Sequence, residues 1–420
     1  MNDQSLNRAV LLDQQDPLSA FGRAFEIPQD DNGNPLVYLC GNSLGLQPKQ
    51  TKNYIHQELE HWAKWGVDGH VKGHNAWLPY HELLTHQMAR VVGAKDQEVV
   101  VMNTLTVNLH LMMVSFYQPS AHRHKRIIEA DAFPSDRYAV ESQINFHGYK
   151  PEQSLLLWQP NPETGLCELS DLQALIDKHQ DSIALIMLGN SNYYSGQVYP
   201  IGEITELGHH CGAKVGFNLA HGAGNILCDL HHNNVDFAVW CSYKYLNSGP
   251  GSLGGVFVHQ RHAKAHKLPR FTGWWGHNKE TRFKMRDAFE PMDGAEGWQL
   301  SNPPILSMAA IRASLEIFDR AGMTALREKS LKLTAFLAEL LSSLDTDKIR
   351  IMTPLDPDQR GAQLSLQIKN SDRSLHKALT DSGVVSDWRE PDVIRVAPAP
   401  LYNSFQDVYN FVQRLNHCLK

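Results

Sequence analysis

The feature that most constrains this chain is the alternation of short apolar segments with longer amphipathic ones between residues 99 and 258. The short segments are mostly apolar, as in strands that are buried on both faces. The longer segments that lie between most of them are typical of helices. Strands separated by helices predict a mostly parallel sheet that is covered on both sides. The expected strands are 99–102, 126–130, 154–158, 183–188, 214–217, 237–241 and 255–258, and the expected helices are 106–117, 135–146, 169–179 and 201–211.

The regular alternation of expected strands and helices ends near Pro303 and Pro304, which indicates a second domain. The chain has 420 residues, which is more than one ordinary domain needs. Beyond the prolines we expect helices at 307–320, 325–344, 375–382 and from 405, and strands at 350–352, 363–368 and 393–396. The sequence therefore predicts an α/β protein with three parts: an N-terminal segment (1–60) that packs with the small domain, a large domain (61–303) and a smaller α+β domain (304–420).

Composition narrows the class of protein. A net charge of -6 argues against nucleic acid or an anionic membrane as the main partner. No apolar run is long enough to span a bilayer, and residues 1–5 lack the basic and apolar regions of a secretory signal. The six cysteines are scattered without a CxxC pair, which indicates reduced thiols. We expect a cytoplasmic enzyme that acts on a small molecule.

Lys244 is the first candidate for catalysis. It follows the apolar segment 237–241 and precedes a turn rich in Asn, Ser, Gly and Pro. Burial disfavours the ammonium form, so the pKa of such a lysine falls and a free amine becomes available. A neutral amine can form a Schiff base with a carbonyl group and later act as a base. The alternative is a lysine whose stem packs on aromatic rings while its amine reaches water.

Two motif matches do not indicate sites. Residues 249–254 fit G-x-G-x-x-G, but they lead into an expected strand, whereas a dinucleotide fingerprint leads into a helix. His81 and His86 are five residues apart, whereas a zinc-binding helix needs histidines four residues apart. We therefore expect no metal site.

The residues near Lys244 in the predicted fold suggest a pyridoxal phosphate site, which needs a lysine, phosphate donors, an aromatic ring and a partner for the ring nitrogen. Leu105 and Thr106 begin an expected helix, whose free N–H groups and dipole favour a phosphate. Phe133 can stack on the cofactor ring, and Ser135 and Asp136 follow an expected strand end. The alternative is that Thr106, Ser135 or Asp136 merely caps a helix.

Several motifs in one order make the chain resemble the kynureninase family. The resemblance runs from about residue 38 to the C-terminus. It implies the aspartate aminotransferase fold (fold type I), pyridoxal phosphate, a homodimer with active sites at the subunit interface, and hydrolysis of L-kynurenine or 3-hydroxy-L-kynurenine to anthranilate or 3-hydroxyanthranilate and L-alanine. The motifs are 40–48 (CGNSLGLQP), 105–110 (LTVNLH), 133–136 (FPSD), 242–247 (SYKYLN), 273–277 (GWWGH), 301–304 (SNPP) and 395–398 (RVAP).

The resemblance also implies roles for residues, and it exposes two departures. Cofactor contacts are implied for His221, Tyr243, Trp274 and Asn302. The family pattern Asp-x-Ala-His places an aspartate against the pyridine nitrogen, but this chain has Asn218 there. An asparagine supplies no charge, so the electron sink should weaken, and Asp136 would compensate in part. The second departure is Gly189, where some members have a serine that contacts the cofactor.

The implied mechanism uses three polar side chains. Lys244 carries the cofactor and removes the α-proton, Tyr243 donates a proton and contacts the phosphate, and Arg395 clamps the substrate carboxylate. An ion pair between domains is the alternative for Arg395.

Three further residues concern the choice of substrate. The resemblance places His70, Ser301 and Asn302 near the aromatic ring of the substrate, in the pattern of members that prefer 3-hydroxykynurenine. The alternatives are a surface histidine and an asparagine that only ends a turn.

Two rival functions stay open at this point. A lyase of the cysteine desulfurase type needs a reactive cysteine on a mobile loop, whereas Cys241 and Cys211 are expected in strands. A catalytically impaired homologue would bind the cofactor, and Asn218 would disable it for chemistry, leaving a structural or regulatory role.

Overall fold

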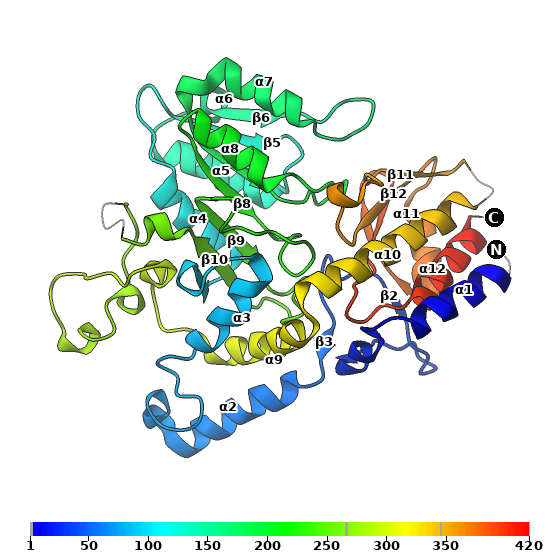
Figure 1. Cartoon of the computed structure of the whole chain (residues 1–420), viewed down its shortest axis with the longest axis horizontal. Helices are drawn as coiled ribbons and strands as arrows, with labels where there is room; N and C mark the ends of the chain where they lie inside the picture. Colours follow the sequence, from blue (N-terminus) through cyan, green and yellow to red (C-terminus); the bar gives the residue numbers. More distant parts are fainter. Residues whose placement is uncertain (1–2, 265–267, 345–346, 420) are drawn as a thin grey trace.

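A seven-stranded sheet forms the large domain of the computed structural model, which describes residues 3–264, 268–344 and 347–419 (Figure 1). The strand order is β4-β10-β9-β8-β7-β5-β6, and β10 alone runs antiparallel to its neighbours. All seven expected strands are present, with ends that shift by one residue at most. Their bounds are β4 Val99–Met102, β5 Lys125–Glu129, β6 Leu155–Trp158, β7 Ile183–Gly189, β8 Lys214–Asn218, β9 Phe237–Cys241 and β10 Gly254–Val258.

Helices cover both faces of this sheet, as the apolar strands predict. In β9, Phe237 and Val239 join the core beneath α4 and α5, whereas Ala238 and Trp240 join the core beneath α3, α7, α8 and α9. Each strand therefore buries both of its faces. The bounds are α3 Glu82–Val92, α4 Leu105–Phe116, α5 Pro134–Phe146, α6 Pro151–Ser154, α7 Leu169–His179, α8 Ile201–His210 and α9 Ile305–Ala321.

The small domain is built on an antiparallel sheet of order β11-β12-β15-β14, and both chain ends lie beside it (Figure 1). Its core joins apolar residues of the sheet to those of its helices. Strand β14 was not expected from the sequence. The bounds are α10 Met323–Ser342, β11 Ile349–Ile351, β12 Leu364–Ile368, α11 Arg373–Asp381, β13 Val384–Val385, β14 Asp387–Arg389, β15 Val393–Val396 and α12 Phe405–Cys418.

The N-terminal segment connects the two domains. Helix α1 (Asp3–Gln14) packs against α12, and β2 (Val37–Tyr38) pairs with β13. Strands β1 (Phe25–Glu26) and β3 (Gln47–Pro48) pair with each other. Helix α2 (Thr51–Trp65) packs instead along α9 (Figure 1). The boundary expected at residue 60 therefore falls inside α2.

Two sequence expectations concern the chain as a whole. Within the described residues, no helix has both the length and the apolar character to cross a membrane. All six cysteines are free, and Cys241 lies in β9. The expectation that Cys211 lies in a strand is wrong, because this residue caps the C-terminus of α8.

Candidate active site

A cavity of about 360 Å³ contains most of the residues that the sequence singled out. It lies at the carboxyl ends of β4, β5, β7, β8 and β9, where ligands bind in open α/β sheets. The N-terminal segment contributes Asn42 and Ser43, and the small domain contributes Arg389 and Arg395. The site is therefore assembled from segments that are far apart in the sequence.

Lys244 lies in this cavity just beyond the end of β9. Its Nζ is 3.1 Å from Nε2 of His221. Burial lowers the pKa of Lys244, and burial, followed by the charge of Lys244, lowers the pKa of His221 well below its usual value. His221 is thus a neutral acceptor for the amine. Tyr243 lines the same cavity, and burial raises the pKa of Tyr243, so its phenol keeps its proton.

Two helices begin at the cavity wall. Helix α4 starts at Leu105 after Thr104, and α5 starts at Pro134 after Phe133; neither N-cap residue makes a side-chain capping bond. Thr106 Oγ1 lies 3.2 Å from Ser135 Oγ, so the two first turns face each other. The capping interpretation of Thr106, Ser135 and Asp136 is therefore wrong, and the helix N-termini leave N–H groups for an anion.

Asn218 and Asp136 form a buried pair at the base of the cavity. Asn218 Nδ2 donates to Asp136 Oδ2 at 2.7 Å, and the backbone N–H of Ala220 donates to Asn218 Oδ1 at 2.9 Å. The second contact fixes which end of the amide faces Asp136. Burial raises the pKa of Asp136 to about 6, although Asn218 and Lys244 oppose the shift. Asp136 Oδ1 is buried without a hydrogen-bond partner among the described residues.

Arg395 enters the cavity from β15. Its Nη1 donates to the Tyr193 carbonyl at 2.6 Å, which links the small domain to the large one, and its Nη2 pairs with Asp387. The ion pair of Arg395 is thus within the small domain and not between domains, so that alternative is wrong, and Arg395 also lines the cavity. Phe133 lies at the rim with its ring edge-on to Tyr193, at 5.2 Å between centroids.

Four candidates do not line this cavity. His70 lies in the turn after α2, where its Nδ1 is 2.9 Å from the Val67 carbonyl. Trp274 is half exposed and donates through Nε1 to the Arg282 carbonyl. Ser301 and Asn302 are exposed just before α9. Their assignments to cofactor and substrate stay predictions.

Sequence reasoning missed Glu129, which lines the cavity at the end of β5. The Gly189 N–H donates to Glu129 Oε1 at 3.0 Å. A Cβ at Gly189 would lie 2.9 Å from that oxygen, so the glycine makes room for the carboxyl. Burial raises the pKa of Glu129 to about 8. A carboxyl directly after the apolar pair Ile127 and Ile128, at the end of a buried strand, was the signal that could have revealed it.

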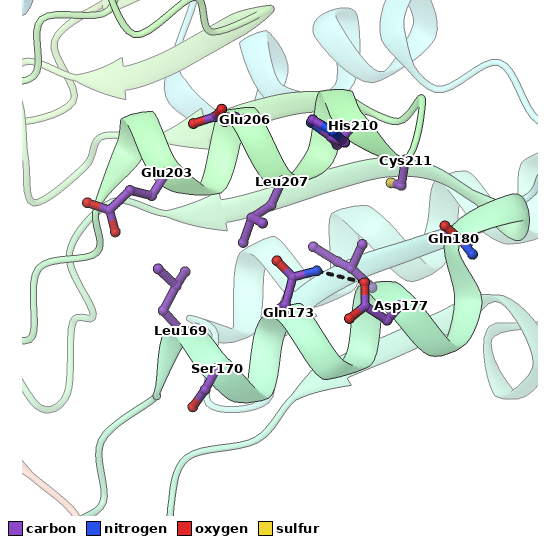
Figure 2. Close-up of a pocket in the computed structure, with 11 residues that line it drawn as sticks. Leu169, Ser170, Gln173, Asp177, Gln180, Glu203, Glu206, Leu207, His210 and Cys211 are labelled. Carbon is purple, nitrogen blue, oxygen red and sulfur yellow. Dashed lines mark hydrogen bonds between the residues drawn. The ribbon is translucent and has the colours of Figure 1, made fainter.

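A larger cavity, of about 590 Å³, lies between α7 and α8 and carries none of these features (Figure 2). On α7, Gln173 Nε2 donates a hydrogen bond to Asp177 Oδ1 at 2.7 Å. Glu203, Glu206 and His210 line the cavity from α8. It contains no residue singled out by the sequence except Cys211. Volume alone therefore does not locate the site.

Comparisons with known proteins identify the family of this chain. A family model described as the kynureninase C-terminal domain matches residues 326–415. The chain is 56% identical over 413 residues to a kynureninase of Myxococcus xanthus, covering 98% of this chain and 97% of the relative. The chain belongs to the kynureninase family. A kynureninase of Koribacter versatilis is 54% identical over 412 residues, with the same shares covered.

Solved structures similar to this kynureninase-family chain show its fold. The cysteine desulfurase CsdA of Escherichia coli superposes with a TM-score of 0.75 at 16% identity, covering 96% of this chain and 98% of that one. The cystine C-S lyase C-DES, in complex with cysteine persulfide, gives 0.74 at 16% identity, covering 91% and 97%. At this identity the likeness concerns architecture alone, and it confirms the α/β architecture of fold type I.

Proposed function

We propose that this chain is a pyridoxal-phosphate-dependent kynureninase. It hydrolyses the Cβ–Cγ bond of L-kynurenine or 3-hydroxy-L-kynurenine and releases L-alanine with anthranilate or 3-hydroxyanthranilate. The observation that carries the proposal is the position of Lys244: a buried amine with a lowered pKa, in a cavity at the strand ends of a kynureninase-family chain.

The donors in the cavity fit pyridoxal phosphate. Leu105, Thr106 and Ser135 lie at two helix N-termini that suit the phosphate. The buried Asp136 Oδ1 without a partner suits a protonated ring nitrogen, and Asn218 holds Asp136 in place. Phe133 is the candidate for the ring face and Lys244 for the covalent attachment. When bound, the cofactor supplies an aldehyde carbon that accepts an amine and a ring that withdraws electrons.

Different side chains of the cavity carry out the steps of the proposed reaction. Arg395 binds the substrate carboxylate and so orients Cα toward Lys244. Lys244 Nζ, whose pKa burial lowers, is the candidate base for the proton on Cα, and His221 stays neutral beside it. Tyr243 keeps its proton at neutral pH and is the candidate proton donor to Cβ when the Cβ–Cγ bond breaks. Water attacks the γ-carbonyl of the substrate.

The finer assignments belong to the same proposal. The enzyme works as a homodimer, in which His70, Ser301 and Asn302, together with Trp274, reach the site of the partner subunit. A pocket with polar groups for the phenolic hydroxyl prefers 3-hydroxy-L-kynurenine, because those groups lose their partner when L-kynurenine binds. The scattered free cysteines favour a reducing compartment such as the cytoplasm.

Assay of the purified chain with cofactor and each substrate tests the proposal. We expect the fluorescence of anthranilate or the absorbance of 3-hydroxyanthranilate to grow with time. Lys244→Ala should lose the visible absorption of the bound cofactor and at least about three orders of magnitude in rate. Lys264→Ala, at an exposed lysine, is the matched control. Cofactor binding without product would favour the impaired homologue, and sulfide release from cysteine would favour the desulfurase.

A further inference from the structure

Asp387 is the shared acceptor of three segments at the cavity. Its Oδ2 accepts hydrogen bonds from Ser43 Oγ at 2.9 Å, from Arg389 Nη2 at 3.1 Å and from Arg395 Nη2. Ser43 belongs to the N-terminal segment, whereas Asp387 and Arg389 lie on β14 and Arg395 on β15. Arg395 and Asp387 are buried, so this cluster is largely shielded from solvent.

The cluster carries one positive charge in excess. Two guanidinium groups share one carboxylate, because Arg389 and Arg395 both pair with Asp387. The neighbouring Arg395, after burial, lowers the pKa of Arg389, which shows that the two cations oppose each other. A single anionic group from a ligand would complete the charge balance, and a buried excess charge favours such a partner.

Each arginine of the cluster also has one donor without a partner. The Nε atoms of Arg389 and Arg395 are both buried without a hydrogen-bond partner among the described residues, and both arginines line the cavity. A buried donor without a partner costs free energy that a ligand oxygen can recover. Asp387 thus occupies Nη2 of both arginines, and the Nε–H of each guanidinium remains without a partner.

We propose that Asp387 determines the charge specificity of this subsite: by leaving one excess positive charge on the two arginines, it makes the subsite accept a monoanionic carboxylate and reject dianions. The proposal rests on the proposed function, since that function supplies an amino acid substrate with one α-carboxylate. A dianion of similar size would bring an unmatched negative charge into a buried site, whereas without Asp387 the two arginines would match it.

Competitive inhibition of the holoenzyme by sulfate and by acetate measures this specificity. The holoenzyme is used because the cofactor engages Lys244, the other cation within electrostatic reach of both arginines, and fills the phosphate site. In Asp387→Asn the ratio of the inhibition constants, sulfate over acetate, should fall at least tenfold. Asp387→Glu keeps the charge and should keep the wild-type ratio. Asp392→Asn, at a carboxylate that accepts from Gln367 instead, is the matched control.

Two further variants keep the proposal testable if one variant fails to fold. Arg389→Gln removes one cation, so it should weaken inhibition by both anions and raise the KM of the substrate while changing kcat less. The double variant Asp387→Asn with Arg389→Gln returns the cluster to one excess charge and should restore the sulfate-to-acetate ratio to within threefold of wild type. An unchanged ratio in folded Asp387→Asn, or no restoration in a folded double variant, would overturn the proposal.

Calorimetry separates this proposal from the proposed function. Titration of the holoenzyme with sodium sulfate and with sodium acetate reports the same ratio without any turnover. If wild type fails to cleave kynurenine but Asp387→Asn still gains sulfate affinity tenfold, the proposed function fails and the subsite stands. If kynurenine is cleaved and the calorimetric ratio is unchanged in the variant, the subsite proposal fails alone.

Discussion

Asn218 shows how a single side chain changes the electrostatics of the site. Its amide holds Asp136 at 2.7 Å, so the only carboxylate of this pair is Asp136. Asn218→Asp adds a second carboxylate beside the cofactor ring. Because a charged partner keeps the ring nitrogen protonated, turnover should rise by roughly one to three orders of magnitude. Steady-state rates and the cofactor spectrum measure this; if both stay as in wild type, the side chain at residue 218 does not influence the ring nitrogen.

Glu129 makes the stability of the protein depend on pH. Burial raises the pKa of Glu129 from 4.5 to about 8. Between these values the folded protein binds the proton more tightly than the unfolded chain, so the free energy of unfolding should fall as pH rises. Relative to Glu129→Gln, wild type should lose up to about 5 kcal/mol between about pH 5 and 8. Urea titrations of both proteins across this range measure the difference, and parallel pH profiles would contradict it.

At the scale of elements, the sequence predicted the strands of the large sheet, whose pattern recurs along the chain, and missed the short strand β14. The seven strands of the large sheet are mostly apolar, so their pattern is strong, and only their ends shifted. Strand β14 has three residues and reads Asp387, Trp388, Arg389, which carries little strand signal. Arg389 was missed for that reason. Ser43 lay in a quoted motif, but nothing local indicates that it meets β14.

The register of β9, on which the position of Lys244 depends, is fixed by Asp236 at its start. This carboxylate accepts from the Val215 N–H on β8 at 2.8 Å, from His209 on α8 at 2.8 Å and from His262 beyond β10 at 2.7 Å. Burial alone would raise the pKa of Asp236, but His209, His262 and Arg261 hold it well below its usual value. The network therefore joins several elements at the amino end of β9.

Asp236→Ala should lower the free energy of unfolding by about 3–5 kcal/mol, because it leaves buried donors and cations without their partner. Asp319→Ala removes a partly exposed ion pair with Arg90 and should cost about 1 kcal/mol or less. Urea unfolding followed by tryptophan fluorescence compares the two. Equal costs would show that the Asp236 network does not hold the strand.

The whole molecule explains why the site was only partly predictable. Residues near Lys244 lie at the ends of consecutive strands, and the parallel topology brings such ends together, so the sequence could group them. Arg389, Arg395 and Ser43 arrive from the small domain and the N-terminal segment, and no local pattern encodes that approach. His70 and Asn302 do not line the cavity of their own chain, and the proposed homodimer would have them serve the site of the partner subunit.

Mixed dimers test whether these residues act across the interface. The double variant His70→Trp with Asn302→Thr should lose the preference for 3-hydroxykynurenine, and Lys244→Ala should be inactive. In a mixed dimer of the two, the site with an intact Lys244 receives the unchanged His70 and Asn302 of the Lys244→Ala subunit. Because only that site is active, the mixed dimer should regain the wild-type preference at about half the wild-type rate. Competing-substrate assays on tagged, co-purified dimers measure the preference. If the mixed dimer keeps the altered preference of the double variant, His70 and Asn302 act within their own subunit.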